Sequence, residues 1–223
     1  MRRVIVFLKY PEPGQVKTRL AATVGPSVAA RLARHFAQAT LAAADSLGLP
    51  VDICYAPAGR EADFRAWLGD GRVYFPQAGR DLGRRMGAAF ETAFAQGAQR
   101  VVLVGTDAPD RPAHFLHEAF ARLGDHDVVL GPALDGGYHC IAMQRDGFVP
   151  QAFAGIDWST PRVLAQTLDV LRRSRRSVHM LPPWPDIDDA AGLAEYLKTH
   201  PEAAKLLEDT DDPNGSAPCQ TKA

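Results

Sequence analysis

Residues 4–20, VIVFLKYPEPGQVKTRL, carry the strongest indication of the fold class. The segment opens with five consecutive apolar residues, Val4 to Leu8, a run typical of a β-strand buried on both faces. Lys9 ends the run, and a polar loop with two prolines and one glycine follows at once. This order is typical of a parallel α/β sheet, in which ligands bind beyond the carboxyl ends of the strands.

Outward from this segment, short apolar runs alternate with amphipathic stretches. Further strands are predicted at residues 51–55, 72–75, 101–104, 128–130, 138–143 and 178–181. Helices are predicted at residues 28–47, 61–68, 82–97, 112–123, 164–171 and 190–207, where apolar residues recur every three or four positions. The alternation predicts an α/β protein with three layers and a mainly parallel sheet.

Length and composition restrict the class of protein. With 223 residues, 46% of them hydrophobic, the chain can bury about 70% of its unfolded surface without disulfides or a structural metal. Its 25 basic and 26 acidic residues give a net charge of −1, so no nucleic-acid partner is expected. Three scattered cysteines and the lack of a membrane-spanning run predict a reduced, cytoplasmic protein. Residues 1–208 are expected to form one domain, and residues 209–223 a disordered polar tail.

The loop after the first strand carries three cations, Lys9, Lys17 and Arg19. Prolines stiffen this loop and Gly14 lets it bend, so the three side chains can converge on a phosphate. Val16 precedes Lys17 where the common phosphate-loop motif requires glycine, so that motif is absent. Lys17 and Arg19 are expected to lie in the loop itself, outside any packed apolar face. The alternative is a solvated basic loop.

Acidic side chains follow two later strands. Asp107 comes after strand 101–104, where a carboxylate can hold a divalent cation that bridges phosphate oxygens. Asp110 is interpreted instead as a helix cap. Asp186 and Asp188 follow strand 178–181 as a second source of carboxylate ligands, and Asp189 is a candidate cap of the last helix. Without a metal, Asp107 and Asp188 are expected to repel each other.

Two further loops combine turn residues with candidate ligand residues. Asp135-Gly136-Gly137-Tyr138 separates two predicted strands, and Asp-Gly alone is a common hairpin turn. In Asp157-Trp158-Ser159-Thr160-Pro161, Thr160 is either the N-cap of a helix that begins at Pro161 or a ligand-binding residue. The residues by themselves leave both alternatives open.

Seven motifs follow one another along the chain: Lys9-Tyr10-Pro11 with Pro13-Gly14, Val16-Lys17-Thr18-Arg19-Leu20, Asp81-Leu82-Gly83-Arg84-Arg85-Met86, Gly105-Thr106-Asp107, Gly131-Pro132 with Asp135-Gly136-Gly137-Tyr138, Trp158-Ser159-Thr160-Pro161 and Asp186-Ile187-Asp188. Over residues 3–200 they resemble a bacterial family of GT-A-fold, nucleotide-diphospho-sugar transferase-like proteins, some labelled arsenosugar-biosynthesis glycosyltransferases. The chain is similar, more weakly, to phospholactate and molybdenum-cofactor guanylyltransferases. The resemblance implies a Rossmann-like GT-A fold.

The resemblance also implies roles for individual residues. It implies a nucleotide site made of Lys9, Gly14, Lys17, Arg19, Gln77, Gly79, Asp81, Gly83 and Thr106, with the three cations on the phosphates. Asp135, Gly136, Gly137, Tyr138, Trp158 and Ser159 would face the sugar or the acceptor. Asp107 and Asp188 would hold Mg²⁺ or Mn²⁺, with Asp186 as the second choice. Position 105 is glycine, so the first acid of the Asp-x-Asp motif of GT-A enzymes is missing.

The leading functional hypothesis is a metal-dependent glycosyltransferase that uses a nucleotide-diphospho-sugar donor and a small-molecule acceptor. The metal and the loop cations would neutralise charge on the departing nucleoside diphosphate. Asp107 and Lys17 would take part in catalysis, and Asp135 would orient or deprotonate the acceptor hydroxyl. The alternatives are a guanylyltransferase-like nucleotidyltransferase that releases pyrophosphate from an NTP, and a nucleotide-binding module without catalysis.

Overall fold

A computed structural model describes residues 1–208, and the predicted tail at residues 209–223 lies outside the described residues. A seven-stranded sheet with the order β3-β2-β1-β4-β6-β5-β7 forms its centre. The strands are β1 (Arg2–Lys9), β2 (Val51–Ala56), β3 (Tyr74–Pro76), β4 (Arg100–Val104), β5 (Val128–Pro132), β6 (Tyr138–Gln144) and β7 (Val178–Met180). Among these, β6 alone runs antiparallel to its neighbours, β4 and β5. The predicted mainly parallel sheet is confirmed.

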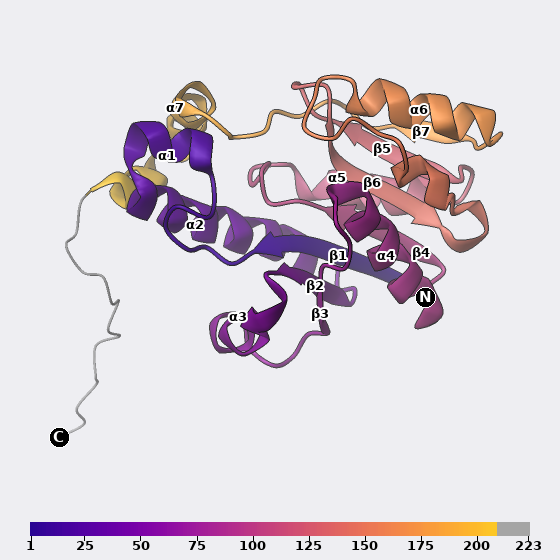
Figure 1. Cartoon of the computed structure of the whole chain (residues 1–223), viewed down its shortest axis with the longest axis horizontal. Coiled ribbons are helices and arrows are strands. Elements are labelled where there is room, and N and C mark those ends of the chain that lie inside the picture. The colour runs from indigo at the N-terminus through magenta and orange to yellow at the C-terminus, as the bar shows by residue number, and fades with distance from the viewer. Residues whose placement is uncertain (209–223) are drawn as a thin grey trace.

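Helices cover both faces of the sheet (Figure 1). They are α1 (Thr18–Val24), α2 (Pro26–Asp45), α3 (Glu61–Leu68), α4 (Leu82–Ala95), α5 (Ala113–Arg122), α6 (Val163–Arg173) and α7 (Ala190–Thr199), with short 3-10 turns at η1 (Ala58–Arg60), η2 (Arg145–Gly147), η3 (Pro150–Phe153) and η4 (Pro201–Leu207). Side chains of β1 alternate between the two faces, with Val4 packed against α2 and α5 and Ile5 against α4. The three predicted layers are therefore present.

A third apolar cluster joins the first two helices to the end of the chain. Leu20 of α1 and Phe36 of α2 pack against Leu193 and Tyr196 of α7, all of them buried. Figure 1 shows α1 and α7 together at one end of the molecule. Because β1 leads into α1, this cluster holds the polar loop of residues 10–17 against the edge of the sheet.

Two predicted boundaries are wrong, each for a physical reason. Residues 18–24 form helix α1 rather than a loop, because buried Leu20 ties them to the third cluster. The last helix ends at Thr199, since Pro201 lacks the N–H that a continuing α-helix needs, and a 3-10 turn follows. Helix α6 begins at Val163, one residue before the predicted start at residue 164, so the alternative of a helix that begins at Pro161 does not hold. The N–H of Leu164 bonds to the carbonyl of Gly136 at 2.9 Å. No helix in the described part of the chain is long and apolar enough to cross a membrane.

Candidate functional site

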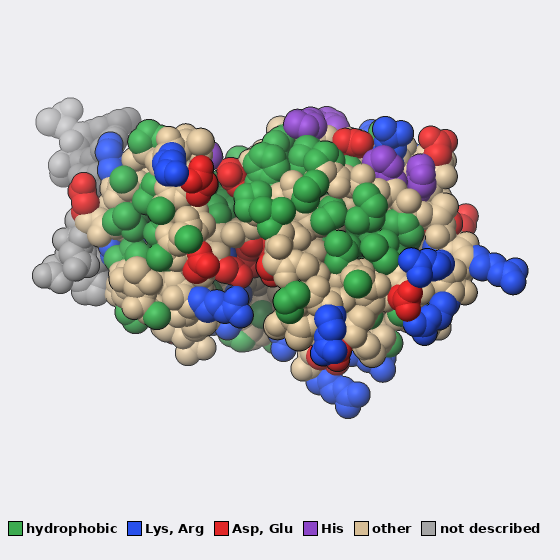
Figure 2. Space-filling view, turned by 90° about the horizontal axis from the view of Figure 1, so that it is seen from above, with side chains coloured by type: hydrophobic (Ala, Val, Ile, Leu, Met, Phe, Trp, Pro, Cys, Tyr) green, Lys and Arg blue, Asp and Glu red, His purple; other side chains and the backbone are tan. Residues whose placement is uncertain are grey.

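A cleft of about 820 Å³ opens beyond the carboxyl ends of β1 and β4. Many of the predicted site residues line it: Lys9, Lys17, Arg19, Gln77, Thr106, Asp107, Asp135, Gly137, Tyr138, Trp158, Ser159, Asp186 and Asp188. Figure 2 shows a hollow between the two halves of one face, with acidic side chains along it. The cleft therefore brings together residues from six separate segments of the chain, as expected for ligand binding at this edge of a parallel sheet.

Two carboxylates meet across the cleft through a lysine. The ammonium of Lys17 donates hydrogen bonds to Asp107, to Oδ1 of Asp188 at 2.9 Å and to the carbonyl of Ile187 at 2.9 Å. Only 6% of the Lys17 side chain is exposed. The repulsion expected between Asp107 and Asp188 is offset without a metal, because the lysine charge lies between them. The alternative of a solvated basic loop does not hold for Lys17, whose side chain is buried.

Electrostatics keep Lys17 charged. Burial alone lowers the pKa of its ammonium. Attraction to Asp107 and Asp188, together with the hydrogen bonds that the ammonium donates to them, outweighs burial, so the pKa is raised above its ordinary value. The backbone supports the same arrangement, since the N–H of Ile187 bonds to the carbonyl of Asp107 at 2.8 Å. The loop after β4 and the loop before α7 are thereby fixed to each other.

Asp186 lies beneath this pair. Its Oδ1 atom is buried and has no hydrogen-bond partner in the described structure. Burial, followed by repulsion from Asp107, Asp135 and Asp188, raises the pKa of Asp186 to about 7. Within residues 1–208 no cluster of three or more His, Cys, Asp or Glu ligands is positioned to hold a metal by itself. The residues do fit a cation held by two carboxylates and completed by phosphate oxygens and water, which is the usual way proteins bind Mg²⁺.

The opposite wall of the cleft consists of the β5–β6 turn and the loop before α6. Asp135 accepts a hydrogen bond from the N–H of Gly137 at 2.8 Å, so the predicted hairpin turn is confirmed, and the turn also lines the cleft. Gly136 is in the left-handed region, and a Cβ there would lie 2.6 Å from Cα of Pro161. This close approach joins the turn to the loop. In that loop, Ser159 has a φ of 63°, a strained conformation for serine of the kind that clusters at functional sites.

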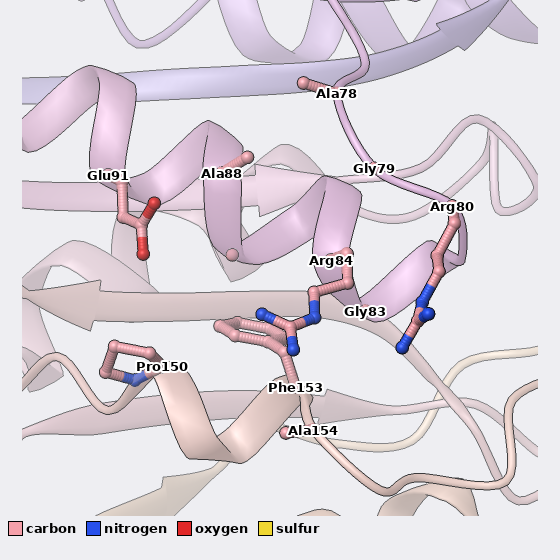
Figure 3. Close-up of a pocket in the computed structure, with 11 residues that line it drawn as sticks. Ala78, Gly79, Arg80, Gly83, Arg84, Ala88, Glu91, Pro150, Phe153 and Ala154 are labelled. Atoms are coloured by element: carbon pink, nitrogen blue, oxygen red, sulfur yellow. The ribbon is translucent and has the colours of Figure 1, made fainter.

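Several predicted nucleotide-site residues do not line the cleft, and the structure gives them other contacts. Asp81 caps α4 by accepting a hydrogen bond from the N–H of Arg84 at 2.8 Å. Gly83 allows Trp158 to pack on α4, since a Cβ at this position would lie 2.6 Å from Nε1 of Trp158. Gly79 and Gly83 line a second hollow of about 450 Å³, with Arg80 and Arg84 along its rim (Figure 3). Gly14 lies in a turn outside the cleft with a φ of 76°.

The predicted caps had mixed outcomes. Asp189 caps α7, accepting a hydrogen bond from the N–H of Gly192 at 2.9 Å, as expected. Asp110 does not cap α5, which begins after Pro112. Instead, Asp110 accepts a hydrogen bond from Nε1 of Trp184 at 3.0 Å. This bond is a further link between the loop after β4 and the loop that carries Asp188.

Sequence reasoning missed the apolar lining of the cleft and one buried cation. Leu82 and Met86 of α4 line the cleft, and Leu82 is 42% exposed there. Arg111 is 3% exposed and donates to the carbonyl of His139 at 3.4 Å, close beneath the cleft. Helical periodicity does include Leu82 at the start of the helix predicted at residues 82–97, but it marks core positions, whereas Leu82 is a rim residue.

Comparisons with known proteins agree with this geometry. Residues 39–160, more than half of the chain, match the family described as "Uncharacterized protein conserved in bacteria (DUF2064)". A crystal structure from Desulfovibrio desulfuricans G20, of a protein provisionally named a nucleotide-diphospho-sugar transferase, is 39% identical, with a TM-score of 0.87 over 92% of this chain and 96% of that one. No curated protein matches the sequence.

Two more distant structures share the fold alone. CMP:2-keto-3-deoxy-manno-octonic acid synthetase in complex with CTP is 12% identical, with a TM-score of 0.57 over 90% of this chain and 98% of that one. Rv0371c from Mycobacterium tuberculosis in complex with manganese is 17% identical, with a TM-score of 0.51 over 89% of this chain and 100% of that one. The chain thus has the fold of nucleotide-diphospho-sugar transferases and nucleotidyltransferases.

Proposed function

Since this chain belongs to the bacterial DUF2064 family, we propose that it is a metal-dependent glycosyltransferase that takes a nucleotide-diphospho-sugar as donor. The observation that carries the proposal is that Asp107 and Asp188 share one positive charge, the ammonium of Lys17. Lys9 and Arg19 line the same cleft. Two carboxylates that can hold a divalent cation, with basic side chains close by, suit a diphosphate that binds together with its metal ion. The fold of the Desulfovibrio protein, with its provisional assignment, supports the same class.

The phosphates of the donor would lie against the wall formed by the end of β1 and the start of α1. Lys9 and Arg19 line the cleft there, and both are exposed. Charge-assisted hydrogen bonds to phosphate oxygens are about twice as strong as neutral ones. Gln77 is less free to bind a ligand, because its amide donates to the carbonyls of Cys54 at 3.2 Å and Leu8 at 3.4 Å.

Asp107 and Asp188 would hold Mg²⁺ or Mn²⁺, which stabilises negative charge on the diphosphate when bound. The manganese complex of Rv0371c supports this choice of ion. Because Lys17 lies between the same carboxylates, its ammonium would then be available to the donor phosphates. Lys17 thus has two successive partners in this proposal, the carboxylates first and the phosphates afterwards.

Asp135 would receive the proton of the acceptor hydroxyl. The acceptor oxygen forms its bond to the anomeric carbon of the sugar as the bond from that carbon to the β-phosphate oxygen breaks, and the nucleoside diphosphate leaves. Asp135 lines the cleft on the wall opposite Lys9 and Arg19, so acceptor and leaving group would lie on opposite sides of the reacting carbon. A positioned carboxylate base contributes about 10²–10⁴-fold to such reactions.

Nucleotidyl transfer is the second candidate. A triphosphate would suit Lys9, Lys17 and Arg19, and the fold is shared with a synthetase that binds CTP. The third candidate, a nucleotide-binding module without catalysis, draws on the glycine at position 105 in place of the first acid of Asp-x-Asp.

One incubation separates the three. Purified protein with Mg²⁺ or Mn²⁺ is given NTPs or UDP-, GDP- and dTDP-sugars together with a panel of acceptors. Release of nucleoside diphosphate supports glycosyl transfer, and release of pyrophosphate supports nucleotidyl transfer. A rise in melting temperature with nucleotide but no turnover would favour the binding module. Asp107→Asn should abolish turnover, whereas Asp110→Asn, which keeps an acceptor oxygen for Trp184, is the matched control.

A further inference from the structure

The two walls of the cleft differ in charge. Lys9, Lys17 and Arg19 all come from the wall formed by β1 and α1. On the wall formed by the β5–β6 turn and residues 156–163, no lysine or arginine is among the described residues that line the cleft. Arg162 belongs to this loop, but its side chain is 69% exposed and pairs with Asp157 at 3.0 Å outside the cleft lining.

Asp135 carries the charge of this second wall. Burial raises the pKa of the Tyr138 phenol, and burial followed by the nearby charge of Arg111 lowers the pKa of His139 to about 3, so both are neutral near pH 7. Asp135 lies close enough to Asp186 to repel its charged form, as do Asp107 and Asp188. Lys17 bonds to Asp107 and Asp188. Arg111 lies beneath this wall and donates to the carbonyl of His139, but it is buried and is not among the residues that line the cleft. An anion bound against this wall would therefore meet the charge of Asp135 with no cation in the lining to bond to.

The same wall offers a fixed apolar surface. The rings of Tyr138 and Trp158 meet edge to face with centroids 6.3 Å apart, and both line the cleft. Trp158 is held in place by Gly83, which leaves no space for a side chain beneath the indole. Leu82, 42% exposed at the rim, extends this surface from α4. Sugars and other polyols combine hydroxyls with a face of C–H groups, and aromatic rings of this kind bind that face.

From these observations we infer the class of acceptor: an uncharged hydroxyl compound with an apolar face, such as a carbohydrate, which packs on Trp158 with a hydroxyl toward Asp135. The inference rests on the proposed function, because it assumes that the donor occupies the cationic wall. Phosphorylated acceptors should bind more weakly, because the charge of Asp135 repels them. The charge of the second wall also separates the two candidate reactions, because a nucleotidyltransferase that acts on a phosphate needs cations on its acceptor side.

The test measures acceptor binding apart from turnover. UDP, GDP and dTDP are first screened with Mg²⁺ for a rise in melting temperature, and the protein is then loaded with the nucleotide that gives the largest rise. Saturation-transfer NMR compares methyl β-glucoside with glucose 6-phosphate as probes. We expect saturation transfer to the neutral probe and binding of the phosphorylated one that is at least about tenfold weaker.

Two variants and a control assign the effect. Trp158→Ala should abolish saturation transfer to methyl β-glucoside, and Asp135→Lys should reverse the preference toward glucose 6-phosphate. Asp157→Lys, a change at an exposed acid outside the cleft lining, should leave the preference unchanged. The inference would be overturned by equal or tighter binding of the phosphorylated probe, by no binding of the neutral probe, or by unchanged saturation transfer in Trp158→Ala. In each of these cases the rise in melting temperature with nucleotide would leave the proposed function standing. Absence of any nucleotide response would overturn the proposed function itself, and the inference with it.

Discussion

Replacing Lys17 with methionine tests how the cleft manages its charges. Methionine keeps most of the apolar stem of lysine and removes the ammonium that bonds to Asp107, Asp188 and the carbonyl of Ile187. The variant should lower the stability of the metal-free protein and raise its affinity for a free divalent ion. These two effects have opposite signs and one cause, the loss of a cation from between two carboxylates.

The size of both effects follows from the contacts. A buried hydrogen bond to a charged group contributes about 1.5–3 kcal/mol to stability. The side chains of Asp107 and Asp188 are 51% and 44% exposed, so solvent screens both ion pairs. We therefore assign each pair the contribution of a surface ion pair, about 0.2–1 kcal/mol. The bond to Ile187 adds about 0.5–1.5 kcal/mol. The sum, about 1–3 kcal/mol, corresponds to roughly 2–4 °C in melting temperature per kcal/mol for a chain of this size. The share that comes from the two carboxylates, about 0.4–2 kcal/mol, no longer opposes metal binding, which should tighten by about 2- to 30-fold.

Electron paramagnetic resonance of Mn²⁺ without nucleotide gives the affinity directly. Lys17→Met should bind Mn²⁺ more tightly than the wild type, and nucleotide with Mn²⁺ more weakly, because the phosphates lose a cation. Arg19→Met is the matched control: Arg19 is exposed two positions further on and bonds to neither carboxylate, so Mn²⁺ affinity without nucleotide should not change. Weaker Mn²⁺ binding by Lys17→Met would refute the reasoning, since it would mean that the lysine assembles the metal position and does not compete for it.

Three further changes test the surrounding structure by thermal and chemical denaturation. Asp110→Ala should destabilise the protein by about 1–2 kcal/mol by leaving Nε1 of Trp184 without a partner, and Asp110→Asn should restore most of this; equal losses would argue against the bond. Burial raises the pKa of Asp127, but hydrogen bonds to its carboxylate and a nearby arginine outweigh burial and hold the pKa below 3.8. Asp127 therefore stabilises the fold at pH values above 3.8, and this stabilisation is lost as the pH falls through the lower pKa of the folded state. Asp127→Asn should therefore reduce stability at pH 7 and weaken its fall below pH 3.8; an unchanged acid limb contradicts this. Gly83→Ala should cost about 1–3 kcal/mol, whereas Gly71→Ala, with open space around it, should be nearly neutral; similar losses would count against the packing argument.

The central strands could be predicted because their signal is local. Val4–Leu8 and Val101–Val104 are continuous apolar runs, and the structure buries nearly all of these residues between two helical layers. Helix α1 could not be predicted in this way. It is only seven residues long and buries one of them, Leu20, so it has no apolar periodicity, and its position depends on α2 and α7.

The site shows the same division between local and distant causes. Its composition could be predicted, because loops after parallel strands converge at one edge of the sheet. The contacts could not. Lys17 meets Asp107 across 90 positions and Asp188 across 171, and Asp110 meets Trp184 across 74. For Asp110 the local pattern predicted a helix cap, but its carboxylate accepts a hydrogen bond from the indole of Trp184 instead.

The position of Lys17 also gives a physical account of the glycine at position 105. A second carboxylate there would add negative charge to a cleft that already holds Asp107, Asp135, Asp186 and Asp188. The chain instead pairs Asp107 and Asp188 with Lys17, so one of their two negative charges is compensated in the metal-free protein. If Asp107 and Asp188 held the proposed metal, Lys17 would exchange these carboxylates for phosphate oxygens of the donor, and its charge would keep a partner. In the proposed reaction, transfer of the sugar would add negative charge to the leaving diphosphate, and a lysine released from the carboxylates would stabilise that charge where it develops.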